Sequence, residues 1–176
     1  MDAKVVADAL HTMLCLGTMS FEAKEEAATK QVAIGTFWPL EAVNLYYPQS
    51  QFFSSPYWGH ARSGVVLEGG KKAVPIKLRL VDKAGVAEKT FTHGVSAGMG
   101  RALTFHLPKD TYARFTVFGG LHPELGAKGR VEFTITGDGK VLGSAIVNGN
   151  DPAHAFDCDV SQVAQLQLSL TSRGLD

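Results

Sequence analysis

Alternation of apolar and polar residues is the feature that most constrains how the second half of this chain can fold. From about residue 74, at least six short segments alternate or are rich in β-branched and aromatic residues: VPIKLRLV, ALTFHL, YARFTVFGG, VEFTITG, KVLGSAIV and QLQLSL. Successive side chains of a strand point to opposite faces, so a period of two predicts strands with one buried face. Because no helical pattern separates these segments, they predict an antiparallel β-sandwich or barrel.

The turn between two of these segments is the sharpest local signal. Residues 137–139 are Gly-Asp-Gly and stand between VEFTIT and KVLGSAIV. An Asp-Gly pair between two such segments predicts a β-hairpin, because glycine accepts the positive φ angle that a tight turn requires.

The first third of the chain carries a helical pattern instead. The apolar residues of the segment 2–16 fall on one helical stripe, at Val6, Leu10, Met13 and Leu14. This spacing predicts an amphipathic helix. Residues 20–31 predict a second helix, with Ser20 as its N-cap and acidic residues in its first turns. We therefore expect a helical N-terminal segment.

The domain organisation follows from these two patterns. We expect the helical segment to cover residues 1–36 and a mainly β, antiparallel sandwich to cover 37–176. Within that sandwich, residues 74–174 carry the clearest strand pattern.

Aromatic residues gather at 37–58, which holds both tryptophans, three of the four tyrosines and three prolines. Flat rings in loops can stack on the C–H faces of sugars while nearby polar groups bind the hydroxyls. The alternative is that these rings pack against the sheets or the N-terminal helices, as most large aromatic residues do. Trp58, Tyr57 and His60 are the first candidates for ligand contact.

Composition excludes several classes of partner. Lysine plus arginine equals aspartate plus glutamate, 17 against 17, so no net field attracts nucleic acid, and a neutral ligand fits this balance better. No apolar stretch reaches the ~18 residues that a membrane-spanning helix needs. Asp2 and Asp8 stand where a signal peptide is basic, so we expect neither a membrane span nor a signal peptide in this chain.

One motif matches a catalytic pattern. GVSAG at 94–98 fits the G-x-S-x-G motif of hydrolases, in which the serine sits on a turn that leads into a helix. Here Ser96 is followed by a predicted strand, so a glycine-rich turn between strands is the favoured interpretation. Cys15 and Cys158 have no CxxC spacing, and both a single bridge and two buried thiols stay open.

Metal-binding motifs are weak. The six histidines show none of the spacings that zinc sites use. Asp151, Asp157 and Asp159 could supply oxygen ligands to calcium, but a turn and the solvent face of a strand fit them better. We expect no cofactor and no catalytic residue.

The order of the strand motifs resembles that of a known family. The segments KTFTHGVSAG, ALTFHLP, YARFTVFGGL, GRVEFTITGDGK and SAIVNGNDPAHAFDCDVSQVAQLQLSL follow one another between about residues 88 and 174. In this order they resemble the NPCBM family of carbohydrate-binding modules, of the carbohydrate-binding module family 51 type, which are appended to bacterial glycoside hydrolases. The hairpin segment, similar to the family's G-x-V-x-F-x-V-x-x-D-G-K, is the most specific part.

This resemblance implies a jelly-roll sandwich related to galactose-binding domains, with a glycan bound by loops at one end and galactose-type sugars as the expected class. It also implies an extracellular or periplasmic location and an adjacent catalytic domain in a longer protein. The candidate ligand residues are polar groups that flank predicted turns, where loops at one end of a sandwich can converge. These are His93, Arg101, His122 and Glu124.

Two functions remain after this comparison. The first is a non-catalytic glycan-binding module of a larger bacterial carbohydrate-active protein. The alternative is a structural or protein-interaction sandwich that has lost its sugar site. The alternative draws on departures from the family pattern, among them Gly98 in place of a histidine after the glycine turn and His122 in place of an acidic residue after the Y-x-x-F strand. A hydrolase that uses Ser96 is a distant third.

Overall fold

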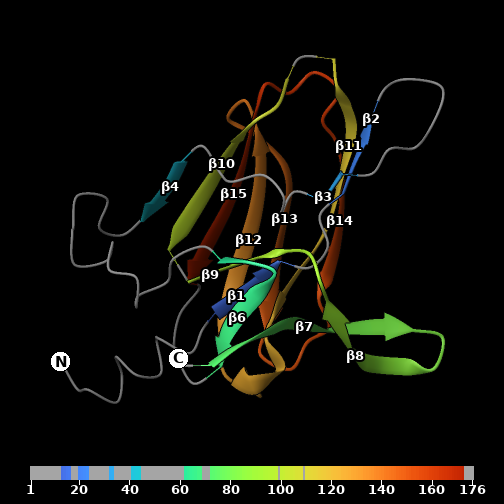
Figure 1. Ribbon diagram of the computed structural model, residues 1–176, viewed down its shortest axis with the longest axis vertical. Helices are drawn as coiled ribbons and strands as arrows, with labels where there is room; N and C mark the ends of the chain where they lie inside the picture. The colour runs from blue at the N-terminus through green and yellow to red at the C-terminus, as the bar shows by residue number, and fades with distance from the viewer. Residues whose placement is uncertain are drawn as a thin grey trace.

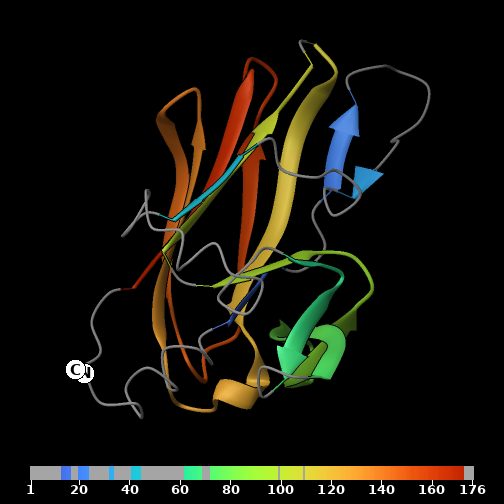
Figure 2. The same ribbon diagram turned by 60° about the vertical axis from the view of Figure 1, so that its left-hand side comes forward.

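The fold is built from three antiparallel sheets (Figure 1). The computed structural model describes residues 13–16, 20–23, 32–33, 41–44, 62–68, 72–98, 100–108 and 110–172. These residues form strands and one short 3-10 helix, η3 (Pro123–Leu125). Two large sheets stack face to face as a sandwich, and a smaller sheet packs against the outside of one of them (Figure 2).

The first large sheet has seven strands and is organised around β11 (Tyr112–Leu121). Along one edge β11 pairs with β14 (His154–Asp159), and along the other with β2 (Ser20–Ala23) and then β1 (Met13–Leu16). The sheet continues through its outer strands, β3 (Val32–Ala33), β9 (Val95–Gly98) and β5 (Arg62–Ser63). Strands from the start of the chain therefore share a sheet with strands from its second half.

The second large sheet has five strands in the order β13-β12-β15-β10-β4. Their bounds are Lys140–Asn148, Arg130–Gly137, Gln165–Ser172, Arg101–His106 and Glu41–Asn44. The predicted hairpin joins β12 to β13: Asp138 and Gly139 have φ angles of 48° and 79°. Two successive positive φ angles match the twist of the paired strands, which confirms the hairpin prediction.

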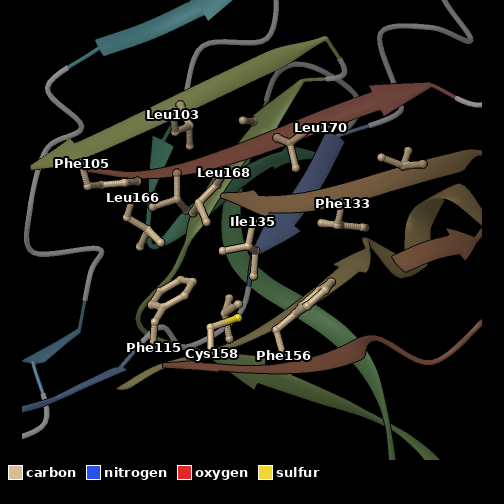
Figure 3. Close-up of a cluster of buried hydrophobic side chains, with 14 of the residues drawn as sticks. Leu103, Phe105, Phe115, Phe133, Ile135, Phe156, Cys158, Leu166, Leu168 and Leu170 are labelled. Atoms are coloured by element: carbon tan, nitrogen blue, oxygen red, sulfur yellow. The ribbon is translucent and has the colours of Figure 1, made fainter. Parts of the chain in front are cut away.

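The core lies between the two large sheets (Figure 3). Alternate residues of each strand point inwards, and the largest of them interdigitate across the sandwich: Phe115, Phe156 and Cys158 from one sheet, and Phe133, Ile135, Leu166 and Leu168 from the other. Full burial of a side chain of this size stabilises the fold by about 1.5–3 kcal/mol. The alternation that identifies the strands in the sequence is thus the pattern that fills the core.

The smaller sheet consists of β6 (Val65–Glu68), β7 (Lys72–Asp82) and β8 (Gly85–Phe91). Its apolar face forms a second cluster, with Ile76, Leu78 and Phe91 packed against Phe118 on the outer side of β11. Gly120 permits the close approach, because a Cβ there would lie 3.1 Å from Leu78 Cδ2. Figure 1 shows the β7–β8 hairpin extending away from the sandwich.

The mainly β, antiparallel sandwich is confirmed, and the predicted helices are wrong where the structure describes them. Residues 13–16 and 20–23 are strands β1 and β2. The apolar run MLCL fits both a helical stripe and a buried strand, and its position against glycine residues of β11 decides for the strand. Within the described ranges, no helix has the length and apolar character needed to cross a membrane.

Candidate functional site

Two connections meet at one end of the sandwich, which we call the η3 end. They are residues 122–129 between β11 and β12 and residues 149–153 between β13 and β14. Because β12 and β14 begin at this end while β11 and β13 finish there, antiparallel pairing brings the two connections together. The η3 end lies at the bottom of Figures 1 and 2.

Residues 122–129 fold into a compact turn around η3. The side chain of His122 caps the helix, and its Nδ1 accepts a hydrogen bond from the Glu124 amide at 3.4 Å. Leu125, only 6% exposed, anchors the turn in the core. Gly126 closes the turn with a φ of 57°, in the left-handed region that glycine adopts without strain. The turn is therefore stabilised by the His122 cap, by the glycine at its end and by the packing of Leu125 in the core.

His122 and Glu124 differ in what they can offer a ligand. His122 is 4% exposed, and because its Nδ1 accepts an amide hydrogen, the neutral ring carries its proton on Nε2. Glu124 is exposed. His122 therefore shapes the turn, while the Glu124 carboxylate is accessible to a molecule that approaches from solvent.

A second tight turn lies beside the first. Asp151 Oδ2 accepts hydrogen bonds from the backbone N of Asn148 at 3.0 Å and from its Nδ2 at 2.6 Å. Gly149 lies so close to the first turn that a Cβ would be 2.3 Å from the Lys128 carbonyl oxygen and 2.5 Å from that of Gly126. The two turns are thus in direct backbone contact and form one continuous surface.

The structure brings two of the predicted site residues together: His122 and Glu124 both belong to the η3 end. Arg101, of which only the backbone is described, begins β10 and pairs with Leu170 and Asn44, and Figure 1 shows the start of β10 away from η3. His93 does not join them: it is exposed in the β8–β9 connection, and its Nδ1 lies 2.9 Å from Thr92 Oγ1. The turn after β11 therefore carries two of the four polar candidates, and their contact with a ligand stays a prediction.

The aromatic candidates Trp58, Tyr57 and His60 lie outside the described residues. The strands on either side of that segment are described. β4 ends at Asn44, which pairs with Arg101, and β5 begins at Arg62, which pairs with Ser96.

The nucleophile pattern has no hydrolase geometry. Ser96 lies within strand β9 rather than on a turn, is 0% exposed, and donates a hydrogen bond to the Val65 carbonyl oxygen at 2.6 Å. Strand β10, not a helix, follows it. Ser96 therefore links β9 to β6, and the glycine-rich turn expected at 94–98 is largely strand.

The three aspartates considered for calcium have separate local partners. Asp151 holds the turn at Asn148, and Asp157 pairs with Arg114 on the outer face of β11 and β14. Asp159 Oδ1 accepts a hydrogen bond from the Ser161 amide at 2.9 Å. Among the described residues, no group of three or more His, Cys, Asp or Glu side chains could hold a metal ion.

Cys158 is a free thiol buried in the core of the sandwich, so the bridge to Cys15 is not formed. Burial raises the pKa of this thiol above its ordinary value of 9.0, and the negative charge of Asp157 raises it further. The thiol therefore stays protonated at neutral pH and acts as an apolar core group.

Sequence analysis missed the residues that hold the η3 end together. Arg79 of β7 donates hydrogen bonds to the carbonyl oxygens of Pro123 and Gly149, one from each turn. Gly149 and Asp151 were also not identified as parts of this end. An Asn-x-x-Asp spacing with an internal glycine is a local turn signal that could have found the second turn. No local signal marks Arg79.

Comparisons with known proteins agree with this architecture. A family model described as NPCBM/NEW2 domain matches residues 53–175. The structure of CBM51 from Clostridium perfringens GH95 in complex with methyl-galactose is 15% identical, with a TM-score of 0.63 over 82% of this chain and 89% of that one. No curated protein sequence matches the chain.

Two further similar structures come from multidomain chains. The structure of CBM51-2 in complex with GlcNAc and INT domains from Clostridium perfringens ZmpB is 14% identical, with a TM-score of 0.60 over 81% of this chain. This chain covers 27% of that structure. It also covers 15% of the M60 catalytic domain with the CBM51-1 and CBM51-2 domains of the same protein, with 13% identity, a TM-score of 0.59 and 85% of this chain aligned. At these identities the likeness shows a shared fold.

Proposed function

Because the chain belongs to the NPCBM/NEW2 domain family, we propose that it is a non-catalytic module that binds a glycan at the η3 end of its sandwich. The observation that carries this proposal is the joined surface of two tight turns, with Glu124 exposed on it. Rigid turns at one end of a sandwich can hold polar groups in fixed positions for a ligand.

The chemistry of these groups suits sugar hydroxyls. A carboxylate such as Glu124 accepts hydrogen bonds, and a guanidinium such as Arg101 donates them. A neutral hexose also agrees with a chain whose net charge is zero. The ligands in the structures of similar fold, methyl-galactose and GlcNAc, are hexoses of this kind. We therefore propose a galactosyl or N-acetylhexosaminyl ligand.

The aromatic segment supplies the expected stacking ring. The strand before it ends at Asn44, beside Arg101, and the strand after it begins at Arg62, beside Ser96; the sequence between them holds six aromatic residues: Tyr46, Tyr47, Phe52, Phe53, Tyr57 and Trp58. Trp58 precedes Arg62 by four positions, and an extended chain of that length spans about 14 Å at most. We propose Trp58, with Tyr57 and His60, as the stacking platform.

A module of this kind binds weakly and serves a larger protein. A few hydrogen bonds and one stacked ring correspond to a Kd on the order of 10⁻³ to 10⁻⁵ M. Tethering to a catalytic domain or repetition of the module raises the effective affinity. We propose this role in a longer bacterial protein that acts on extracellular glycans.

One observation favours a second candidate function, contact with a protein partner. Val81 and Val86, a cross-strand pair near the tip of the β7–β8 hairpin, are 68% and 58% exposed. Apolar residues exposed on an extended hairpin are common in protein contacts. A sandwich that binds a partner through this hairpin would not need a sugar site.

A titration of the ¹⁵N-labelled chain with methyl β-galactoside and, separately, with GlcNAc tests the first function. We expect amide shifts at Gly126, Gly149 and Asp151, with Gly139 at the opposite end unchanged. Shifts confined to the opposite end, or none with either sugar, would refute the proposal.

Substitutions refine the same experiment. Glu124→Ala and Trp58→Ala should each weaken binding about tenfold, because each removes one part of the contact. Glu88→Ala is the matched control, since Glu88 is also an exposed glutamate but lies on β8. Equal affinity for the Glu124 variant and the wild type would exclude the η3 turn from the site.

A further inference from the structure

Arg79 connects the two turns of the η3 end from a third part of the chain. It lies on β7, outside both connections of the η3 end, and is partly buried. Its Nη1 donates a hydrogen bond to the Gly149 carbonyl oxygen at 2.7 Å, and its Nη2 donates to that of Pro123 at 3.1 Å. One guanidinium therefore bridges the two turns, and hydrogen bonds from a charged donor are stronger than those from a neutral one.

The backbone of Arg79 adds a third point of attachment. The amide of Ala153 donates to the Arg79 carbonyl oxygen at 2.7 Å, which fixes the end of the second connection to β7. At the contact between the turns, Gly149 faces the carbonyl oxygens of Gly126 and Lys128. Several carbonyl oxygens therefore lie close together around this contact. The Arg79 guanidinium donates hydrogen bonds to two of them, those of Pro123 and Gly149.

We propose that Arg79 is a positioning residue for the glycan site: it holds the two turns in the arrangement that binds the sugar. The ordering of the turns then occurs on folding, and the ligand does not have to meet that entropy cost. The planar fork of arginine reaches two carbonyl groups from two nitrogens, whereas the single ammonium of lysine cannot reproduce this geometry. The inference rests on the proposed glycan-binding function.

The test compares three variants by calorimetric titration with methyl β-galactoside and GlcNAc. Arg79→Met should weaken sugar binding about tenfold or more, and Arg79→Lys should fall between it and the wild type. Asp138→Ala is the matched control. The Asp138 carboxylate also makes two hydrogen bonds to the backbone, with the amides of Ala164 and Gln165, but at the opposite end of the sandwich. This control should lose stability and keep its affinity within about twofold.

Two results would overturn the inference: wild-type affinity in Arg79→Met, or an equal loss of affinity in Asp138→Ala. If Arg79→Met fails to fold, Arg79→Lys decides by the same criterion. Amide hydrogen exchange separates this inference from the proposed function, because it needs no sugar. Faster exchange at Gly126 and Asp151 in the Arg79 variants alone supports positioning even if wild-type protein binds neither sugar. Unchanged exchange at these amides overturns it.

Discussion

The two ends of the sandwich hold their connecting segments in place in different ways. At the end opposite η3, which we call the hairpin end, β12 turns directly into β13 at Asp138 and Gly139. The Asp138 carboxylate accepts hydrogen bonds from the amides of Ala164 and Gln165, so one side chain in the turn fastens the neighbouring connection. At the η3 end, the chain instead runs through two separate turns that Arg79 joins from β7.

The conformation of the hairpin end is therefore determined by residues close together in the sequence, whereas the conformation of the η3 end depends on residues far apart in it. The hairpin end needs an Asp-Gly pair at the right position, and its register follows from the alternating residues on either side. The η3 end needs three segments of chain to arrive together. An end built in the second way can carry different side chains on its turns without changing the strands below, which suits a ligand-binding role.

The largest expected effect comes from closing the space between the two turns. Gly149→Ala places a Cβ 2.3 Å from the Lys128 carbonyl oxygen, and the atoms that it would meet are all backbone atoms of residues 126–128, which cannot rotate away as a side chain can. We expect a loss of about 3 kcal/mol of unfolding free energy, at the upper end of overpacking costs. Urea denaturation followed by circular dichroism measures it.

Gly137→Ala at the hairpin end is the matched control for this substitution. Its Cβ would lie 2.6 Å from Val163 Cγ2 and 3.0 Å from Leu142 Cδ1, and both are methyl groups of side chains that can rotate. We expect a cost of about 1 kcal/mol. If both alanines destabilise the protein equally, the η3 end is no more tightly packed than the hairpin end, and the comparison fails.

The second-largest loss of unfolding free energy is expected for Asp138→Ala. It removes two hydrogen bonds of 2.9 and 3.0 Å from the Gln165 and Ala164 amides, and it places alanine at a φ of 48°. We expect a loss of about 2 kcal/mol, from the capping interaction and from backbone strain together. Asp138→Gly should recover part of this loss, because glycine accepts the angle. No recovery would show that the carboxylate alone matters.

The same distinction between local and distant determinants explains which parts of the fold could be predicted from the sequence. The strands over 74–81, 102–107 and 165–170 were predicted because their alternating residues are the residues that fill the core. The predicted helix over 2–16 was wrong for Met13–Leu16, because a short apolar run is compatible with either periodicity. These four residues form a strand because they pair with β9 and β11, which lie far away in the sequence.

The site was predictable only in part for the same reason. Turn positions pointed to His122 and Glu124, which do lie at the η3 end, but they did not show that His122 is buried as a helix cap. Arg79 bonds to carbonyl groups 44 and 70 positions further along the chain, and no periodicity or motif encodes contacts at that distance. The role of Trp58 stays a prediction.

A smaller effect is expected at alkaline pH, from Cys158 in the core. Burial raises the pKa of its thiol above 9.0, so above pH 9 the unfolded chain loses the thiol proton first. The contribution of this thiol to stability is therefore complete below pH 9 and is lost as the pH rises through the folded-state pKa. Melting temperatures between about pH 8 and about pH 10 should fall more steeply for the wild type than for Cys158→Ala. Parallel curves would contradict this assignment.

The smallest effect sharpens the comparison between two arginines. Arg114 forms a bidentate pair with Asp157 on the outer face of the sheet, where the two side chains are 52% and 50% exposed. Although this is a pair of opposite charges, water screens it, and Arg114→Met should cost about 0.5 kcal/mol or less. Within the part of the chain that the structure describes, the Arg79 side chain donates to two neutral carbonyl groups, yet it is partly buried and joins two turns. Its loss should therefore cost more than the loss of Arg114.

Thermal denaturation of the Arg79→Met and Arg114→Met variants at low and high salt measures the difference, and only the Arg114 contribution should shrink with salt. The reverse ranking would mean that surface charge, rather than the bridge between the turns, holds this sandwich together.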